Sequence, residues 1–230
     1  KICENLEADG VKIYPYNEVY SYVQAIPSGS RIFLSKSGVN SRLVSNIPAD
    51  AVILDEVNLT LLPKAVKNQT EMDNERAAHI KDGVAVTKFI RWMKTNVAKE
   101  RITELSAAEK LYQFRSEQEH FLGDSFDPII AYGKHAAIVH YSATEETDIP
   151  LEARGMVLAD TGGHYLEGTT DITRTFALGP VTEEMKADFT RVCRSNMNLA
   201  NARFLYGCSG MNLDIIAREP FWEAGLDFKH

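Results

Sequence analysis

The feature that most limits the fold is a change in amino-acid composition after Gly123. From there to Leu178 the chain consists of short segments rich in Ile, Val, Tyr and Thr, separated by glycine-containing turns. These segments are DPIIAYG, HAAIVHY, RGMVLAD, GHYLEG and DITRTFAL. Short β-branched segments bounded by turn residues are typical of antiparallel strands. We therefore expect a curved antiparallel sheet of at least four strands.

Two helices are expected before this sheet in the chain and two after it. From Thr70, apolar residues recur at helical spacing and give one apolar face, made of Val86, Phe89, Ile90, Met93 and Val97. Capping patterns place the start of the second helix at Ser106 and the N-cap of the third at Thr182, with the third ending near Phe204. The last helix is expected over residues 212–223. This order predicts an α+β fold with helices laid on one face of an antiparallel sheet.

The first sixty residues have a different pattern. Strand-like runs KIYPY, RIFLS and AVILD alternate with helical stretches, which favours a βαβ-type layer with a parallel or mixed sheet. Sixty residues are few for a complete doubly wound domain, so the segment is expected to be the end of a larger one. The proline-containing stretch 57–70 lacks apolar periodicity, and we place the domain boundary there.

Composition excludes several classes of protein. Of the 230 residues, 44% are hydrophobic and 25% are charged, which is usual for a soluble globular protein. The net charge is −7 and the basic residues are scattered, so no nucleic-acid partner is expected. No run approaches the roughly 20 apolar residues of a membrane-spanning helix. Three cysteines without CxxC spacing indicate reduced thiols and a cytoplasmic location. A start at Lys1 without methionine predicts a fragment.

Two aspartates stand out within the predicted sheet. Asp160 ends VLAD and precedes Thr-Gly-Gly, where an aspartate is often only a turn residue. Asp171 begins DITRTF, although strands disfavour aspartate. If the two strands pair, the carboxylates converge, and such a pair either shares a proton or holds a metal. Oxygen ligands suit manganese, or zinc if nitrogen joins them, but a catalytic dication needs at least three protein ligands.

Longer stretches resemble a known family. DSFDPIIAYGKHAAIVHYS, followed by VLADTGGHYLEGTTDITRTFALGP, is similar to the Xaa-Pro aminopeptidases, which share the pita-bread fold with prolidase, methionine aminopeptidase and creatinase. The resemblance covers residues 63–230. It implies that 63–230 is the N-terminal half of the pita-bread metallopeptidase domain, and that 1–62 is the C-terminal part of an α/β middle domain.

The resemblance also implies a metal site. The family holds two divalent ions, typically manganese, with zinc or cobalt as alternatives, on two Asp, one His and two Glu. Asp160 and Asp171 match the two aspartates. The metal-binding histidine follows a first histidine in His-x-x-x-His, and His230 matches that first, non-ligating one. Three ligands are therefore outside this sequence, and the chain alone is expected to bind metal weakly and to be inactive.

The sequence suggests a role at the metal site for two further residues. His140, at the end of the apolar run AAIVH, matches a family histidine beside the metals that helps to hold the substrate. Without the resemblance, it reads as a structural histidine at the end of a strand. Thr173 lies two residues beyond Asp171, so its hydroxyl is expected on the same side of the strand, where it would orient that carboxylate.

The activity implied by the resemblance is hydrolysis of the first peptide bond in Xaa-Pro peptides by a metal-bridging hydroxide. The expected partners are peptides with proline at the second position, and a homodimer is expected from the family. Prolidase, which cleaves only dipeptides, has the same metal ligands and is the first alternative. The second is a non-catalytic pita-bread module that binds partners. Retention of both aspartates argues against that module and against creatinase, which works without metal.

Overall fold

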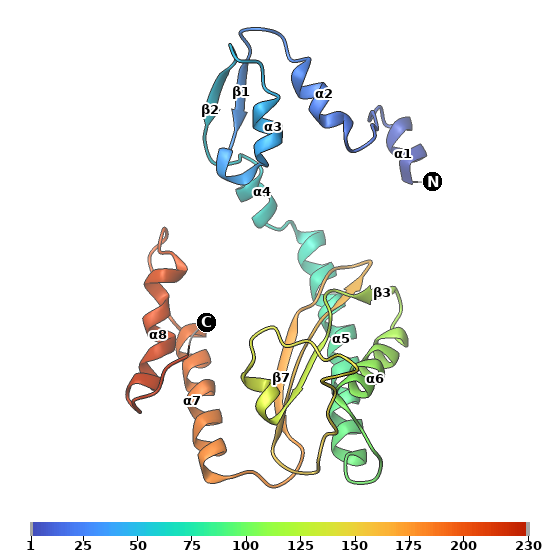
Figure 1. The fold of residues 1–230 in the computed structure, drawn as a ribbon, viewed down its shortest axis with the longest axis vertical. Coiled ribbons are helices and arrows are strands. Elements are labelled where there is room, and N and C mark those ends of the chain that lie inside the picture. The colour runs from blue at the N-terminus through green and yellow to red at the C-terminus, as the bar shows by residue number, and fades with distance from the viewer. Residues whose placement is uncertain (1, 229–230) are drawn as a thin grey trace. The chain divides into compact units, whose positions relative to one another are not determined.

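The computed structural model describes residues 2–228 (Figure 1). The chain separates into two compact units, Lys1–Asn68 and Gln69–His230. His230, the predicted first histidine of His-x-x-x-His, lies outside the described residues. Within those residues, no helix combines the length and apolar character that a membrane crossing requires.

The N-terminal unit contains a two-stranded parallel sheet, as the alternating pattern predicted. Its strands are β1 (Arg31–Leu34) and β2 (Val52–Asp55), and four helices and one 3-10 turn accompany them: α1 (Ile2–Ala8), α2 (Glu18–Gln24), η1 (Lys36–Gly38), α3 (Ser41–Ser45) and α4 (Leu61–Ala65). The expected strand KIYPY is wrong, because residues 12–16 form no strand. Pro15 in this run lacks the N–H that a sheet ladder needs.

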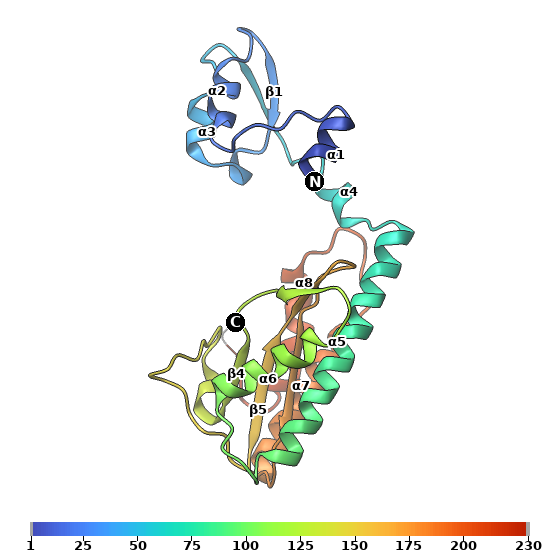
Figure 2. The ribbon, with the colours of Figure 1, turned by 90° about the vertical axis from the view of Figure 1, so that its right-hand side faces the viewer.

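The C-terminal unit is built from helices laid against antiparallel strands (Figures 1 and 2). Its central sheet has the order β4-β5-β7, and a second pair is β3-β6. The strands are β3 (Phe121–Asp124), β4 (Ile129–Tyr132), β5 (Met156–Thr161), β6 (Gly163–Tyr165) and β7 (Ile172–Ala177). The helices are α5 (Gln69–Asn96), α6 (Glu104–Ser116), η2 (Gly133–Ala137), α7 (Glu183–Ala200) and α8 (Gly210–Trp222). This arrangement confirms the α+β class.

The core lies between the helix pair α5 and α6 and one face of the central sheet (Figure 2). The predicted apolar face of α5 is buried, and Phe89 and Met93 are fully inaccessible. The Phe89 ring meets Phe176 of β7 edge to face, with centroids 6.4 Å apart. Along β5, buried residues alternate with half-buried ones, because successive side chains of a strand point to opposite faces. The sheet therefore has a core face and an open face.

Two helix boundaries differ from the sequence expectation, and one agrees with it. Helix α6 is capped by Thr103, not Ser106: the Thr103 side chain accepts from the Ser106 amide, and the Ser106 hydroxyl accepts from the Thr103 amide. Thr182 caps α7 as predicted, accepting from Met185 N at 3.1 Å. Helix α7 ends at Ala200, four residues before the expected end.

The expectation of a strand at HAAIVHY is also wrong. Residues 133–137 form the 3-10 helix η2, and His140 follows in a turn with a φ of 54°. A positive φ is uncommon for a residue with a Cβ and does not fit a strand. The central sheet consequently has three strands, and β3 and β6 form a separate antiparallel pair.

Candidate metal centre

The pairing of β5 with β7 determines where the two aspartates lie. Asp160 is directly opposite Thr173, and Thr161 is opposite Ile172, the first residue of β7. Asp171 precedes Ile172, so it is the diagonal neighbour of Asp160 at the same end of the sheet. Diagonal neighbours in a regular antiparallel pair lie about 7–8 Å apart. Both carboxylates are solvent-accessible: Asp160 is half-buried and Asp171 is exposed.

A hydrogen bond fixes the orientation of Asp160. The Thr173 hydroxyl donates to Asp160 Oδ1 at 2.7 Å, on the open face of the sheet. The sequence predicted that Thr173 would orient Asp171, so the partner is different although the role is of the same kind. The cause is the register, which places Thr173 directly across from Asp160. In residues 2–228, Oδ2 of Asp160 has no hydrogen-bond partner.

The donor set at this end of the sheet fits a divalent cation only in part. Asp160 and Asp171 supply carboxylate oxygens, which hard and borderline dications accept. Within the part of the chain that the structure describes, no group of three or more His, Cys, Asp and Glu side chains could hold a metal ion. The two aspartates are therefore compatible with a metal centre whose further ligands come from other residues.

His140 is placed by a buried carboxyl group that the sequence did not single out. Glu104 of α6 is 1% exposed and accepts three donors: the Tyr132 amide at 2.8 Å, the Tyr141 hydroxyl at 2.8 Å and His135 Nδ1 at 3.0 Å. The rings of His135 and Tyr141 stack with centroids 4.4 Å apart. Burial raises the pKa of Tyr141. Glu104 thus holds the segment that contains His140 from both sides, through Tyr132 and His135 before it and Tyr141 after it.

The His140 side chain itself is exposed, and it has no hydrogen bond to any residue in 2–228. Its imidazole is free to contact a ligand. Among the described residues, His140 makes no hydrogen bond or ion pair with Asp160 or Asp171. His140 has a positive φ, and the next residue, Tyr141, belongs to the buried cluster around Glu104.

A second buried polar group lies beneath the aspartates. Asp82 of α5 and Arg115 of α6 form an ion pair with both side chains 0% exposed. Asp124 of β3 also accepts from Arg115, at 3.2 Å, and burial raises the pKa of Asp124 although Arg115 opposes this shift. The sequence contained a signal for this pair: Asp82 falls between Ala78 and Val86 at four-residue spacing, within the apolar face of α5.

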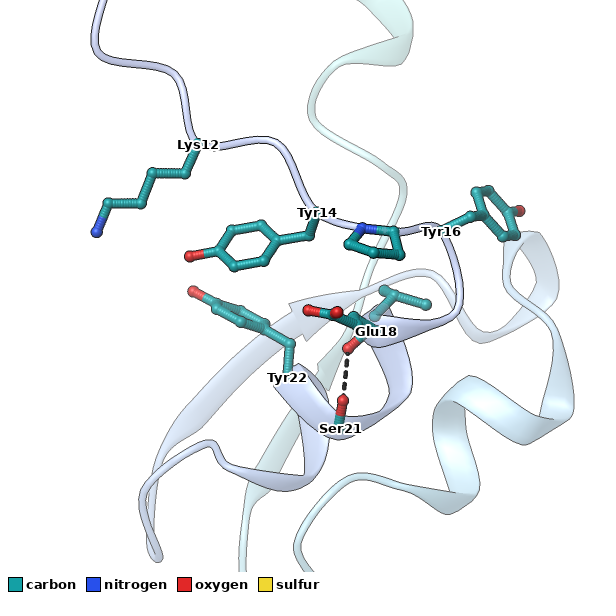
Figure 3. Close-up of a pocket in the computed structure, with 8 residues that line it drawn as sticks. Lys12, Tyr14, Tyr16, Glu18, Ser21 and Tyr22 are labelled. Atoms are coloured by element: carbon teal, nitrogen blue, oxygen red, sulfur yellow. Dashed lines mark hydrogen bonds between the residues drawn. The ribbon is translucent and has the colours of Figure 1, made fainter. Parts of the chain in front are cut away.

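The N-terminal unit contains a cavity, but no group of metal-binding side chains lines it among the described residues. Its volume is about 740 Å³, and its lining comes from residues 12–22 alone. Figure 3 shows Tyr14 and Tyr22 with their hydroxyls at the same end of the groove, while Tyr16 points away. The hydrogen bond drawn there joins the Ser21 hydroxyl to the carbonyl of Glu18, at 2.9 Å. This groove is formed by one short segment, and the candidate site remains at the β5–β7 end.

Relatives of known identity match most of the chain. An Xaa-Pro aminopeptidase 2 from Sus scrofa is 35% identical over 221 residues, which is 96% of this chain and 33% of that protein. The chain therefore spans about a third of the length of the curated relatives it matches.

Solved structures agree with these relatives. The X-prolyl aminopeptidase from Caenorhabditis elegans, described as a cytosolic enzyme with a di-nuclear active site, superposes with a TM-score of 0.87 at 33% identity. That match covers 98% of this chain and 38% of the other. The prolidase from Pyrococcus furiosus has a TM-score of 0.70 at 22% identity, covering 94% of this chain and 60% of the other, and supports the pita-bread fold.

Family comparisons divide the chain near the junction of the two units. Residues 1–71 match the Creatinase/Prolidase N-terminal domain, and residues 73–230 match metallopeptidase family M24. The second match includes both aspartates, His140 and all the strands of the central sheet. The chain belongs to metallopeptidase family M24.

Proposed function

We propose that the protein containing this chain is a metal-dependent aminopeptidase that releases the N-terminal residue from Xaa-Pro peptides. The observation that carries the proposal is the β5–β7 register, which places Asp160 and Asp171 at one end of the sheet in a chain of family M24. The C. elegans relative, described as having a di-nuclear active site, supports it.

In this proposal Asp160 and Asp171 are two ligands of a site for two divalent ions, with manganese as the first choice and zinc or cobalt as alternatives. Thr173 holds Oδ1 of Asp160 and so orients the carboxylate toward a cation at Oδ2. Bound ions would supply Lewis-acid polarisation of the scissile carbonyl and activation of water. The remaining ligands lie outside the described residues.

The substrate class follows from a property of proline. An Xaa-Pro bond has no amide N–H, so a site that grips that group cannot hold it. A metal-centred site avoids this requirement, because it recognises the carbonyl oxygen instead. His140 is the proposed substrate-contacting residue, since its imidazole is exposed and has no partner in residues 2–228.

The domain assignment is part of the same proposal. Residues 1–62 are taken as the end of an α/β middle domain, and 63–230 as the N-terminal half of the catalytic domain. A cytoplasmic location and a homodimer complete it. The cytosolic description of the C. elegans enzyme and the unpaired cysteines support the location: Cys193 and Cys208 are both free and exposed.

The test is hydrolysis of an Xaa-Pro-Xaa tripeptide and an Xaa-Pro dipeptide, each with and without added Mn²⁺, by the longest protein that contains this sequence. Its intact mass is measured first, for comparison with the 25.7 kDa of this chain. Metal-dependent release of the first residue from the tripeptide is expected. Cleavage of the dipeptide alone would assign the protein to prolidase.

Asp160→Asn and Asp171→Asn, with Asp188→Asn as the matched control, connect the activity to the site. Asp188 is an exposed carboxylate on α7 that pairs with Arg191 on the same helix. Both site variants are expected to lose Mn²⁺-dependent turnover, and the control is expected to keep it. A folded parent protein that binds no Mn²⁺ and cleaves neither peptide would instead be a non-catalytic module.

A further inference from the structure

The ion pair between Asp82 and Arg115 is fully desolvated and strongly directional. Arg115 Nε donates to Asp82 Oδ1 at 2.7 Å, and Nη2 donates to Oδ2 at 3.2 Å. Taking two charges out of water costs several kcal/mol for each ion, and only good geometry with additional hydrogen bonds offsets that cost. The other residues that form hydrogen bonds with Asp82 and Arg115 therefore show which segments this ion pair holds in place.

Two of the additional partners are threonines from the β5–β7 region. Arg115 Nη2 donates to the Thr161 hydroxyl at 2.9 Å, and the Thr170 hydroxyl donates to Asp82 Oδ2 at 2.6 Å. The Tyr165 hydroxyl donates to Asp82 Oδ1 at 3.2 Å, and burial together with the nearby Asp82 raises the pKa of Tyr165. The pair thus binds one threonine through the cation and the other through the anion.

Each threonine is the sequence neighbour of a candidate metal ligand. Thr161 follows Asp160 in β5, and their side chains point to opposite faces because they are consecutive in a strand. Thr170 precedes Asp171 and is 0% exposed, whereas Asp171 is exposed. The Thr170 hydroxyl also accepts from the Gly163 amide at 2.9 Å. The backbone at each aspartate is therefore anchored from the core side.

We propose that Asp82 and Arg115 are positioning residues for the metal site, acting on Asp160 through Thr161 and on Asp171 through Thr170. The inference rests on the proposed function. One buried ion pair contacts both ligand-bearing segments and so fixes them relative to each other, which orients the two carboxylates for a cation. An apolar pair of similar volume would stabilise the helices about as well, but it has no directional contact with either hydroxyl.

The test uses Thr161→Val and Thr170→Val in the longest protein that contains this sequence, because valine keeps the shape and removes the hydroxyl. Mn²⁺ affinity is measured by the electron paramagnetic resonance signal of the free ion. Loss of a group that orients a ligand weakens metal binding by about 10–100-fold. Each Val variant is expected to fall in that range, and Thr161→Ser and Thr170→Ser are expected to restore affinity.

A metal-free readout accompanies the titration. In Thr170→Val the Gly163 amide loses its acceptor, so its hydrogen exchange is expected to accelerate without added metal. Thr175→Val is the matched control, because Thr175 is exposed on β7 and does not contact the ion pair. It should leave both the exchange and the Mn²⁺ affinity unchanged.

A double variant, Asp82→Leu with Arg115→Met, separates positioning from stability. It is expected to remain folded by circular dichroism and to bind Mn²⁺ as weakly as the threonine variants. Wild-type affinity in the folded double variant would overturn the inference, as would wild-type affinity in both Val variants. In either case the proposed function stands. A wild-type protein that binds no Mn²⁺ would overturn the proposed function and this inference together.

Discussion

The Tyr141 hydroxyl donates a 2.8 Å hydrogen bond to the Glu104 carboxyl group, 37 positions earlier in the chain. This contact joins the first turn of α6 to the residue that follows His140. Glu104 also accepts hydrogen bonds from the Tyr132 amide and from His135. One carboxyl group therefore fixes the path of the chain from Tyr132 to Tyr141.

Glu104→Ala is expected to lower the free energy of unfolding by at least about 2 kcal/mol. The substitution leaves the Tyr132 amide and His135 Nδ1 without an acceptor, and each unsatisfied group costs about 1–3 kcal/mol, whereas the Tyr141 hydroxyl keeps its 3.3 Å hydrogen bond to Thr147. Urea denaturation followed by circular dichroism measures the change. Glu109→Ala on the exposed side of the same helix is the control and should change stability by less than about 0.5 kcal/mol. Equal effects of the two variants would contradict the anchoring role.

Thr173→Val is expected to weaken Mn²⁺ binding about tenfold with little effect on folding. The change removes the 2.7 Å hydrogen bond to Asp160 Oδ1 at an exposed position, where substitutions usually alter stability by less than about 0.5 kcal/mol. Mn²⁺ titration of the longest protein containing this sequence measures it. Thr173→Ser keeps the hydroxyl and should retain affinity, so equal affinities of the Ser and Val variants would rule out the hydrogen bond as the cause.

Gly162→Ala is expected to destabilise the protein by about 1–3 kcal/mol. An added Cβ would overlap the Thr170 carbonyl and the Ser125 hydroxyl, so the backbone between the two aspartates must shift. Thermal unfolding measures the change. Gly83→Ala in α5 is a matched control because nothing lies within 4 Å of the added atom. It should stabilise the helix by up to about 1 kcal/mol, since alanine is the better helix former. No difference between the two variants would disprove the close approach.

Acid stability is expected to depend on Glu167. Hydrogen bonds from Lys81 Nζ at 2.6 Å and then from His120 Nδ1 at 2.7 Å lower the pKa of Glu167 from 4.5 to about 2. A carboxyl group with a lowered folded-state pKa stabilises the protein above its unfolded pKa. That stabilisation is lost as the pH falls from about 4.5 to about 2.

Glu167→Gln does not titrate, so this variant should lose less stability than the wild type between about pH 6 and about pH 3. Urea midpoints at the two pH values measure the difference. Parallel losses in the two proteins would show that other carboxyl groups account for the acid sensitivity.

The parts of the fold that follow local rules could be predicted from the sequence. The apolar spacing of Phe89 and Met93 predicted the buried face of α5, and the β-branched composition around Asp160 and Asp171 predicted two strands, whose pairing the structure supplies. These signals are local because helical and strand periodicities lie within a few residues.

At KIYPY the wrong expectation overlooked a local signal, Pro15, but at two other places a distant residue decides between local alternatives. HAAIVHY has the composition of a strand, but Glu104 binds His135 and Tyr141 and holds the segment in a turn. At α6, Thr103 and Ser106 each resemble an N-cap. The helix begins after Thr103, and the Asp148 side chain accepts from the Leu105 amide at 3.0 Å. Neither choice is visible from the local sequence.

The candidate site was predictable only in its surface residues. Asp160, Asp171 and His140 could be named because a family resemblance singles out those positions. Asp82 and Arg115 are 33 positions apart, and their link to Thr161 and Thr170 depends on the packing of α5 and α6 against the sheet. Such a network combines charge and burial in three dimensions, so the only sequence clue was a charged residue within an apolar face.

Buried and half-buried side chains alternate along β5, so its residues differ in how freely they can be substituted. Val157, Ala159 and Thr161 face the core, whereas Met156, Leu158 and Asp160 face away from it. A combinatorial library at Met156 and Leu158 would therefore alter the face of β5 that carries Asp160 while the side chains that hold the helices and sheet together stay unchanged. A single strand thus allows the surroundings of a site to diversify without a matching loss of the folded state, which makes this open face of the sheet a natural starting point for directed evolution.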